Sequence, residues 1–192
     1  MTLHNLRALF VGSCLLCSLG VAAADSSAVI DTSAGSYQGN LMINQAAGDG
    51  QQQVNARALA PGAMPNITVE QQQHGASAGP VSSSMQARIS GDAFRSGNGV
   101  LGVNQGAGAA NQQINGFRVG NGVRPESLDD SMLAQSAALT SLNSAAEPAE
   151  VGSRMVDIDD QAFSDSRGVV QLNQAAGVGN RMVNSLGIRI LE

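Results

Sequence analysis

The feature that most constrains this fold is an internal repeat. Residues 39–55, 99–115 and 168–184 align without a gap on the pattern G-x-[LV]-x-[IVL]-N-Q-x-A-G, five free positions and then [VI]-N. Such self-similarity is typical of chains that stack like units. The positions identical in all copies are Gly39, Asn44, Gln45, Ala47, Gly48 and Asn55; Gly99, Asn104, Gln105, Ala107, Gly108 and Asn115; and Gly168, Asn173, Gln174, Ala176, Gly177 and Asn184.

Each copy alternates with the two-residue period of a β-strand. The Ala-Gly pair permits a tight reversal, and a second short strand follows it. A two-stranded unit is marginal alone in water, whereas stacking in register pairs each strand with its neighbours. We therefore predict an all-β fold, with three imperfect strand-turn-strand repeats stacked as a short β-solenoid or cross-β core. Its apolar positions are Leu41, Ile43, Val54, Leu101, Val103, Ile114, Val170, Leu172 and Val183.

The recurring amides have a physical role in such a stack. Identical Asn and Gln side chains would lie about 4.8 Å apart and hydrogen-bond along the axis as ladders. A buried amide without partners costs several kcal/mol, whereas one inside a continuous ladder is satisfied. The alternative is a surface turn with solvated Asn and Gln, which a single copy would favour. Three copies at fixed spacing favour the stack.

The N-terminal segment 1–24 has the order of a secretory signal peptide. A polar start with Arg7 leads into an apolar stretch and an Ala22-Ala23-Ala24 cleavage site. A membrane anchor is the alternative, but the apolar run is short for a span of roughly 20 residues. Processing as a lipoprotein at Cys14 or Cys17 would leave an apolar mature N-terminus. We expect export through the inner membrane, a transient periplasmic stage and a final extracellular or cell-surface location.

Composition divides the remaining chain into repeats and linkers. We predict a first repeat region at 25–60, a flexible linker at 61–87, a second repeat at 88–119, a linker at 120–150 and a third repeat at 151–192. Ile89-x-x-x-Ala93-Phe94 and Ile158-x-x-x-Ala162-Phe163 extend the similarity of the later copies upstream, where the first copy has only Ile30. Within 125–146, a helix capped by Ser127 and a disordered linker are both open. The residues on one face of that helix would be Leu128, Met132, Leu133, Leu139 and Leu142.

Composition also argues against several functions. The chain has no Lys, and its Arg residues are scattered, so a nucleic-acid-binding stripe is not expected. The run 97–102 fits G-x-G-x-x-G, but a β-type repeat follows it where a dinucleotide site needs a helix. His74 stands alone, and the acidic group at 157–160 lacks the spacing of an EF-hand loop. We predict no enzyme, no catalytic or metal-binding residues and no small-molecule cofactor.

The repeats and the signal peptide together resemble a known family. The N-Q-x-A-G and V-N motifs, in a repeat–linker–repeat–linker–repeat plan, look like the Fap functional amyloid subunits of Pseudomonas biofilms. The modest length looks more like the minor, nucleating subunit than the major one. The resemblance implies passage through an outer-membrane export pore, polymerisation outside the cell, and partnership with related fibre subunits. The chain ends Arg-Ile-Leu-Glu without the family's C-x-x-C pair, so redox gating of assembly is not expected. The shorter, consecutive repeats of curli subunits match less well.

Two hypotheses of function follow from these patterns. The first is a secreted structural subunit that self-assembles through Asn- and Gln-laddered β repeats into amyloid-like fibres of a biofilm matrix or adhesive surface. The second is a monomeric secreted β-solenoid that acts as an adhesin or fibre-associated accessory protein. The predicted assembly residues are the apolar positions given above, together with the recurring Asn and Gln residues and the Ala-Gly pair of each copy.

Overall fold

The computed structural model describes residues 25–62, 65–77, 83–121, 133–140 and 152–190. These residues form strands, turns and irregular segments, with no helix among them. The chain runs through the strands in three successive passes, which we call rungs. The first rung is β1 (Ser26–Asp31), β2 (Gln38–Ala47), β3 (Gln52–Pro61) and β4 (Val69–Ser77). The middle rung is β5 (Met85–Ser90), β6 (Asn98–Ala109), β7 (Gln112–Asn121) and β8 (Leu133–Thr140). The third rung is β9 (Arg154–Ile158), β10 (Arg167–Val178) and β11 (Arg181–Ile190).

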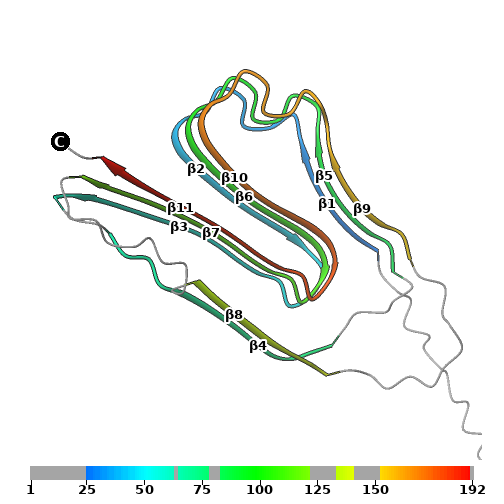
Figure 1. Cartoon of the computed structure of the whole chain (residues 1–192). Coiled ribbons are helices and arrows are strands. Elements are labelled where there is room, and N and C mark those ends of the chain that lie inside the picture. Colours follow the sequence, from blue (N-terminus) through cyan, green and yellow to red (C-terminus); the bar gives the residue numbers. More distant parts are fainter. Residues whose placement is uncertain (1–24, 63–64, 78–82, 122–132, 141–151, 191–192) are drawn as a thin grey trace, which may run out of the picture.

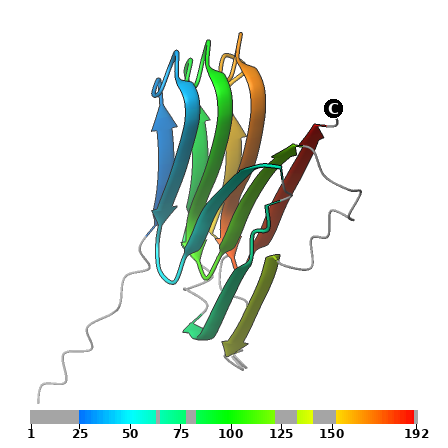
Figure 2. The ribbon, with the colours of Figure 1, turned by 90° about the vertical axis from the view of Figure 1, so that its left-hand side faces the viewer.

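Corresponding strands of successive rungs pair in parallel and make four sheets. Sheet A is β1-β5-β9, sheet B is β2-β6-β10, sheet C is β3-β7-β11, and sheet D is β4-β8. The first two rungs pass from sheet A to sheet D in serpentine order, and the described part of the third rung ends in sheet C, so the sheets lie side by side as layers (Figure 1). A view turned by 90° shows the rungs side by side, from the first (blue) through the middle (green) to the third (orange and red) (Figure 2). The predicted all-β stack of three repeats is confirmed.

The repeats stack in register, so that like residues of the three copies become neighbours. Asn44, Asn104 and Asn173 are paired positions across sheet B, and Gln45, Gln105 and Gln174 follow them. The upstream similarity also becomes a register, because Ile30, Ile89 and Ile158 are partners in sheet A. The repeat is therefore the unit of one rung.

The apolar core lies between sheets A and B. It is built around Ile89, Phe94, Leu101 and Val103 of the middle rung, all fully buried. The rings of Phe94 and Phe163 stack with their centroids 5.2 Å apart and an interplanar angle of 19°. Such stacking contributes beyond the area that it buries. Both rings sit in the arch that joins sheets A and B, and both residues have a φ of +61°.

Two columns of invariant glycines allow the rungs to approach closely. Gly99 has a φ of +136°, and a Cβ there would lie 1.9 Å from the Gly39 carbonyl oxygen of the first rung. Gly108 has a φ of +112°, and its Cβ would lie 2.1 Å from the carbonyl oxygen of Gly177 in the third rung. Only glycine fits both the backbone conformation and the spacing. This contact between rungs explains Gly99 and Gly168 in the first column, and Gly48 and Gly108 in the second.

The position of the reversal differs slightly from expectation. We expected the chain to turn at the Ala-Gly pair, yet β6 and β10 continue past that glycine to Ala109 and Val178. Pairing with the neighbouring rung persists through the glycine, because Gly177 and Gly108 are themselves register partners. The bend then falls at residues 110–111 and 179–180.

Both linkers contain strands. β4 lies within 61–87, which the sequence indicated to be flexible, and its strand pairs with β8 of the second linker. Residues 133–140 form β8, so the helix that the sequence left open for 125–146 is excluded there. The rest of 125–146 lies outside the described residues. Where the structure is described, no helix is long and apolar enough to cross a membrane. The predicted signal peptide likewise lies outside the described residues.

Candidate self-assembly core

Two columns of asparagines run through the stack between sheets B and C. In the first, Asn104 Nδ2 donates to Asn44 Oδ1 at 2.9 Å, and Asn173 Nδ2 donates to Asn104 Oδ1 at 3.0 Å. In the second, Asn115 donates to Asn55 at 2.9 Å, and Asn184 donates to Asn115 at 3.1 Å. The structure therefore brings together all six sequence-predicted asparagines.

The two asparagine columns are also bonded to each other within every rung. Asn55 donates to Asn44 Oδ1 at 2.8 Å, Asn115 to Asn104 Oδ1 at 3.0 Å, and Asn184 to Asn173 Oδ1 at 2.9 Å. Each Asn of the second column also donates to a carbonyl of sheet B, as Asn115 does to Val103 at 3.1 Å. This network satisfies amides that burial would otherwise penalise.

The glutamine column runs between sheets A and B. Gln105 Nε2 donates to Gln45 Oε1, and Gln174 Nε2 donates to Gln105 Oε1, both at 2.8 Å. Gln105 also donates to the carbonyls of Ala28 at 3.1 Å and Arg88 at 2.8 Å. The column thus ties sheet B to sheet A across two rungs at once.

The predicted apolar and small positions fall on defined faces. Leu41, Ile43, Leu101, Val103 and Leu172 belong to the core between sheets A and B. Ala107 belongs to a second buried cluster with Met85 and Ala87, and Ala47 and Ala176 pack against that cluster. Val54, Ile114 and Val183 are register partners in sheet C, and Val170 is the partner of Leu101 in sheet B.

Sequence reasoning missed further amide pairs. Gln112 donates to Gln52 at 2.9 Å, and Gln53 donates to Gln113 at 2.8 Å. Their signal was present, because 52–53 and 112–113 are both Gln-Gln, but Arg181 and Met182 break the match in the third copy. In sheet D, Gln135 donates to Gln71 Oε1 at 2.9 Å and to the Met182 carbonyl at 3.3 Å. Gln71 and Gln135 lie in the two linkers, where no repeat pointed to them.

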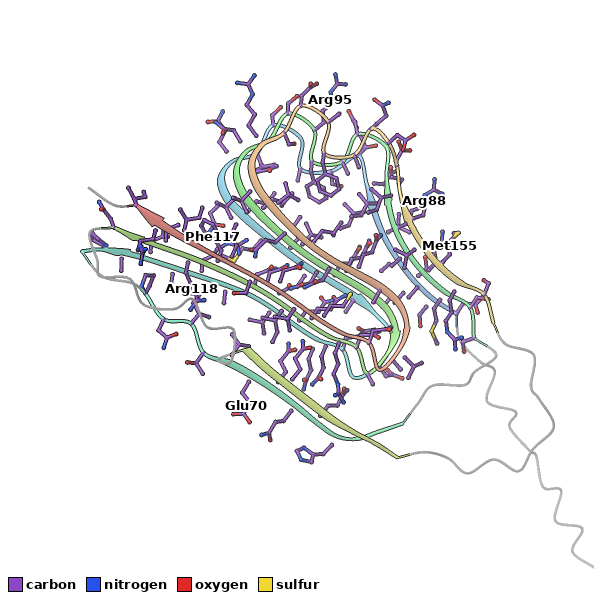
Figure 3. All side chains as sticks on the ribbon, viewed as in Figure 1. Glu70, Arg88, Arg95, Phe117, Arg118 and Met155 are labelled. Atoms are coloured by element: carbon purple, nitrogen blue, oxygen red, sulfur yellow. The ribbon has the colours of Figure 1, made fainter. Side chains whose placement is uncertain are left out.

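Arg57 was also missed, and it joins all three rungs. Its guanidinium lies 5.6 Å from the centroid of the Phe117 ring in the middle rung, a cation–π distance. Nη1 donates to Gln171 Oε1 of the third rung at 3.0 Å. Gly102 leaves the space for this crossing, because a Cβ there would lie 2.4 Å from Arg57 Nη2. Burial lowers the pKa of Arg57 from its usual value. The labelled Phe117 ring lies between sheets B and C (Figure 3).

The three columns of repeated Asn and Gln residues share one direction and stop at the outer rungs, whereas the bond from Gln53 to Gln113 runs the opposite way. In the Gln45 and both Asn columns, the amide nitrogen of each rung donates to the oxygen of the rung before it. The third-rung end therefore presents amide oxygens, and Gln174 Oε1 is buried without a hydrogen-bond partner among the described residues. The outer strands also present one unpaired edge each, because the sheet order ends at them.

The comparison with known families rests on the whole repeat region. Residues 18–191 match the model of the functional amyloid protein FapB/FapC family. The chain belongs to this family. The FapB/FapC match spans every rung, so the predicted resemblance is confirmed. The amide-laddered stack is therefore the structure of a repeat protein from a functional amyloid family. No solved structure matches the chain.

The FapB/FapC family consists of structural amyloid proteins. The described residues offer no candidate metal site. No group of three or more His, Cys, Asp or Glu side chains in that part of the chain could hold a metal ion. His74 lies on β4, outside the amide columns.

Proposed function

We propose that this chain is a secreted subunit that assembles through its amide-laddered rungs into extracellular amyloid-like fibres, which serve as biofilm matrix or adhesive material. The observation that carries this proposal is that the amide ladders have open ends. Columns that are satisfied inside the stack stop at both ends, beside open strand edges. Unpaired edges of this kind are templates for another chain, and monomeric proteins commonly block them.

The exposed outer rungs add a hydrophobic reason for assembly. Val170, Val183 and Ile158 of the third rung are 43%, 42% and 43% exposed. Their partners in the middle rung, Leu101, Ile114 and Ile89, are completely buried. Burying one such side chain fully is worth about 1.5–3 kcal/mol. Addition of a further rung would gain part of that energy at each site.

The same residues that hold the subunit together would then hold the fibre together. In this proposal the Asn and Gln columns satisfy backbone and side-chain groups across each junction, and the apolar columns form its dry core. A continuous ladder with matching side chains is the arrangement that makes amyloid stacks stable.

Passage to the cell surface completes the proposal. The signal-peptide pattern of residues 1–24 supports export through the inner membrane. Family membership supports self-association and partnership with related fibre subunits, and the resemblance described above suggests an outer-membrane export pore.

The test is assembly of the mature chain, residues 25–192, in isolation. We expect thioflavin T fluorescence to rise after a lag and the product to show the 4.7–4.8 Å cross-β reflection. A species that remains monomeric and β-rich under the same conditions would contradict self-assembly and favour the accessory or adhesin function.

A further inference from the structure

The middle rung joins a central amide of the ladders to a chemically permissive neighbour. Asn115 is followed by Gly116. The matching asparagines of the outer rungs are followed by Ala56 and Ser185. A backbone nitrogen can attack the side-chain amide of the asparagine before it, and glycine eases this attack because it has no Cβ and restricts the backbone least. We propose that Asn115 is a site of spontaneous deamidation, open in the unfolded chain and closed in the stack, which disables any chain that it modifies before folding.

The reaction needs only water besides the chain itself. The Gly116 nitrogen loses its proton to solvent and bonds to Asn115 Cγ, and the Cγ–Nδ2 bond breaks with release of ammonia. Water then opens the resulting five-membered succinimide. Cleavage between the ring nitrogen and Cγ gives aspartate. Cleavage between the ring nitrogen and the backbone carbonyl carbon gives isoaspartate, in which the main chain runs through the former side chain.

The stack holds the electrophile of this reaction in place. Asn115 is fully buried, and its Nδ2 donates to Asn55 Oδ1 at 2.9 Å, to Asn104 Oδ1 at 3.0 Å and to the Val103 carbonyl at 3.1 Å. Its Oδ1 accepts bonds from two asparagines of the third rung at 3.2 and 3.1 Å. Ring closure would require the side chain to leave all of these contacts, so it is blocked while the rungs are stacked.

The stack also holds the nucleophile. Gln112 N donates to the Asn180 carbonyl of the third rung at 2.8 Å, and N–H groups two residues apart on a strand point the same way. The Gly116 N–H therefore faces β11, where Ser185 is its register partner. The φ of Gly116 lies outside the left-handed region. The backbone conformation does not demand a glycine at this position, and both outer rungs do without one.

Either product of the reaction would be incompatible with the middle rung. Aspartate at 115 would put a carboxylate oxygen where Nδ2 now meets three acceptor oxygens, all on uncharged groups. A buried charge without a partner is strongly unfavourable. Isoaspartate would add a main-chain carbon inside β7 and displace the residues from Phe117 onward from their register with β3 and β11.

The modification would therefore set a time limit on the unfolded chain. A chain that folds promptly keeps its amide, whereas one that waits unfolded during or after export loses its ability to stack. Supply of fibre subunits would then be restricted to freshly delivered chains. That last consequence rests on the proposed function, whereas the reaction and its suppression by folding concern a single chain.

One experiment compares the wild-type mature chain in concentrated urea and in buffer at the same mildly alkaline pH. Circular dichroism verifies the β-sheet state in buffer, and peptide mass spectrometry measures aspartate and isoaspartate at each position. We expect Asn115 to convert faster than Asn55 and Asn184 in urea. In buffer it should convert at least about tenfold more slowly than in urea, because the reaction must pass through an opened state. Equal rates in urea and buffer, or equal rates at the three asparagines in urea, would overturn the proposal.

A second experiment introduces the product directly. Asn115→Asp should lose the β-sheet circular dichroism and thioflavin T response of the wild type. Asn98→Asp is the matched control, because Asn98 also precedes a glycine but is exposed, and its third-rung partner is Arg167. The control should behave like the wild type, and equal behaviour of the two variants would contradict the proposed damage.

A third variant tests the reaction without relying on folding. Gly116→Ala introduces the residue of position 56 and should slow conversion of Asn115 in urea, whether or not the variant stacks. An unchanged rate would exclude Gly116 as the determinant of reactivity. Failure of the wild-type chain to form fibres would overturn the proposed function alone, since the conversion rates in urea and buffer are measured independently of assembly.

Discussion

The middle and third rungs share the same repeat pattern but differ in exposure at several matching positions. Leu101 and Ile114 are fully buried, whereas their third-rung partners Val170 and Val183 are more than 40% exposed. Gln105 and Asn115 are also fully buried, whereas their third-rung partners Gln174 and Asn184 are only partly buried. Asn173 is the exception, since it is 4% exposed although it lies in the outer rung. Burial in this fold is therefore set by the neighbours along the stack, and the third rung has an interior sequence at a surface position.

The largest expected effect comes from breaking a ladder inside the stack. Val103→Pro removes a backbone donor from a fully buried position of β6 and should abolish both the folded rung and fibre formation. Ile43→Pro should act with it, because it breaks the pairing of β2 with β6. Thioflavin T kinetics and the 4.7–4.8 Å reflection are the measurements. Normal fibre growth with both prolines in place would remove these strands from the core.

An edge proline gives the matched comparison. Ser26 N donates to Ser84 of the middle rung, and successive N–H groups of a parallel strand point to opposite sides, so the Val29 N–H faces the open edge. Val29→Pro should leave the β-sheet circular dichroism of the subunit intact and block elongation. Val29→Ala is the control and should elongate normally.

The aromatic stack should show a smaller difference between the same two rungs. Phe94 is fully buried in the middle rung, and its truncation to Ala should cost about 3–5 kcal/mol of unfolding free energy. Phe163 has a neighbouring rung on one side only, so Phe163→Ala should cost roughly half as much. Urea unfolding of the dilute subunit measures both. Equal losses would mean that the outer rung is as well packed as the middle one.

Amide positions should separate in the same way. Gln105→Leu removes the partner of the Gln45 and Gln174 side chains and of two carbonyls, and should cost at least about 2 kcal/mol. Gln45→Leu, at the open end, should cost less than about 1 kcal/mol in the subunit. The same urea titration tests this pair, and a reversed order would show that the column does not stabilise the interior.

The smallest expected effect is at Arg57. Replacing it with Leu, the residue at the corresponding position 186, loses the ring contact and the bond to Gln171 but also relieves burial of a cation. The two changes oppose each other, so the unfolding free energy should shift by less than about 1 kcal/mol. A loss above about 2 kcal/mol would make Arg57 an essential tie between the outer rungs.

Most of the stack could be predicted from the sequence, because identical residues at fixed spacing identify their own partners. Asn44, Asn104 and Asn173 had to share a column once the copies were in register. Sheet D could not be found in this way. The run 71–73 has no apolar alternation. Gln71 and Gln73 are buried, and they donate to the carbonyls of Gln113 in sheet C and of Gly50 in the turn between β2 and β3. Arg57 was hidden for a similar reason, since its partners come from three different positions of the repeat.

The unequal sheets have a consequence for the appearance of a filament. Among the described residues, sheet D has two strands where each of the other sheets has three. A filament of such units would carry a step on one flank every three strand spacings, about 14 Å along its axis. Each step would mark one molecule. The axial repeat of the subunit would therefore be visible on the filament surface, which is not the case in uniform cross-β stacks.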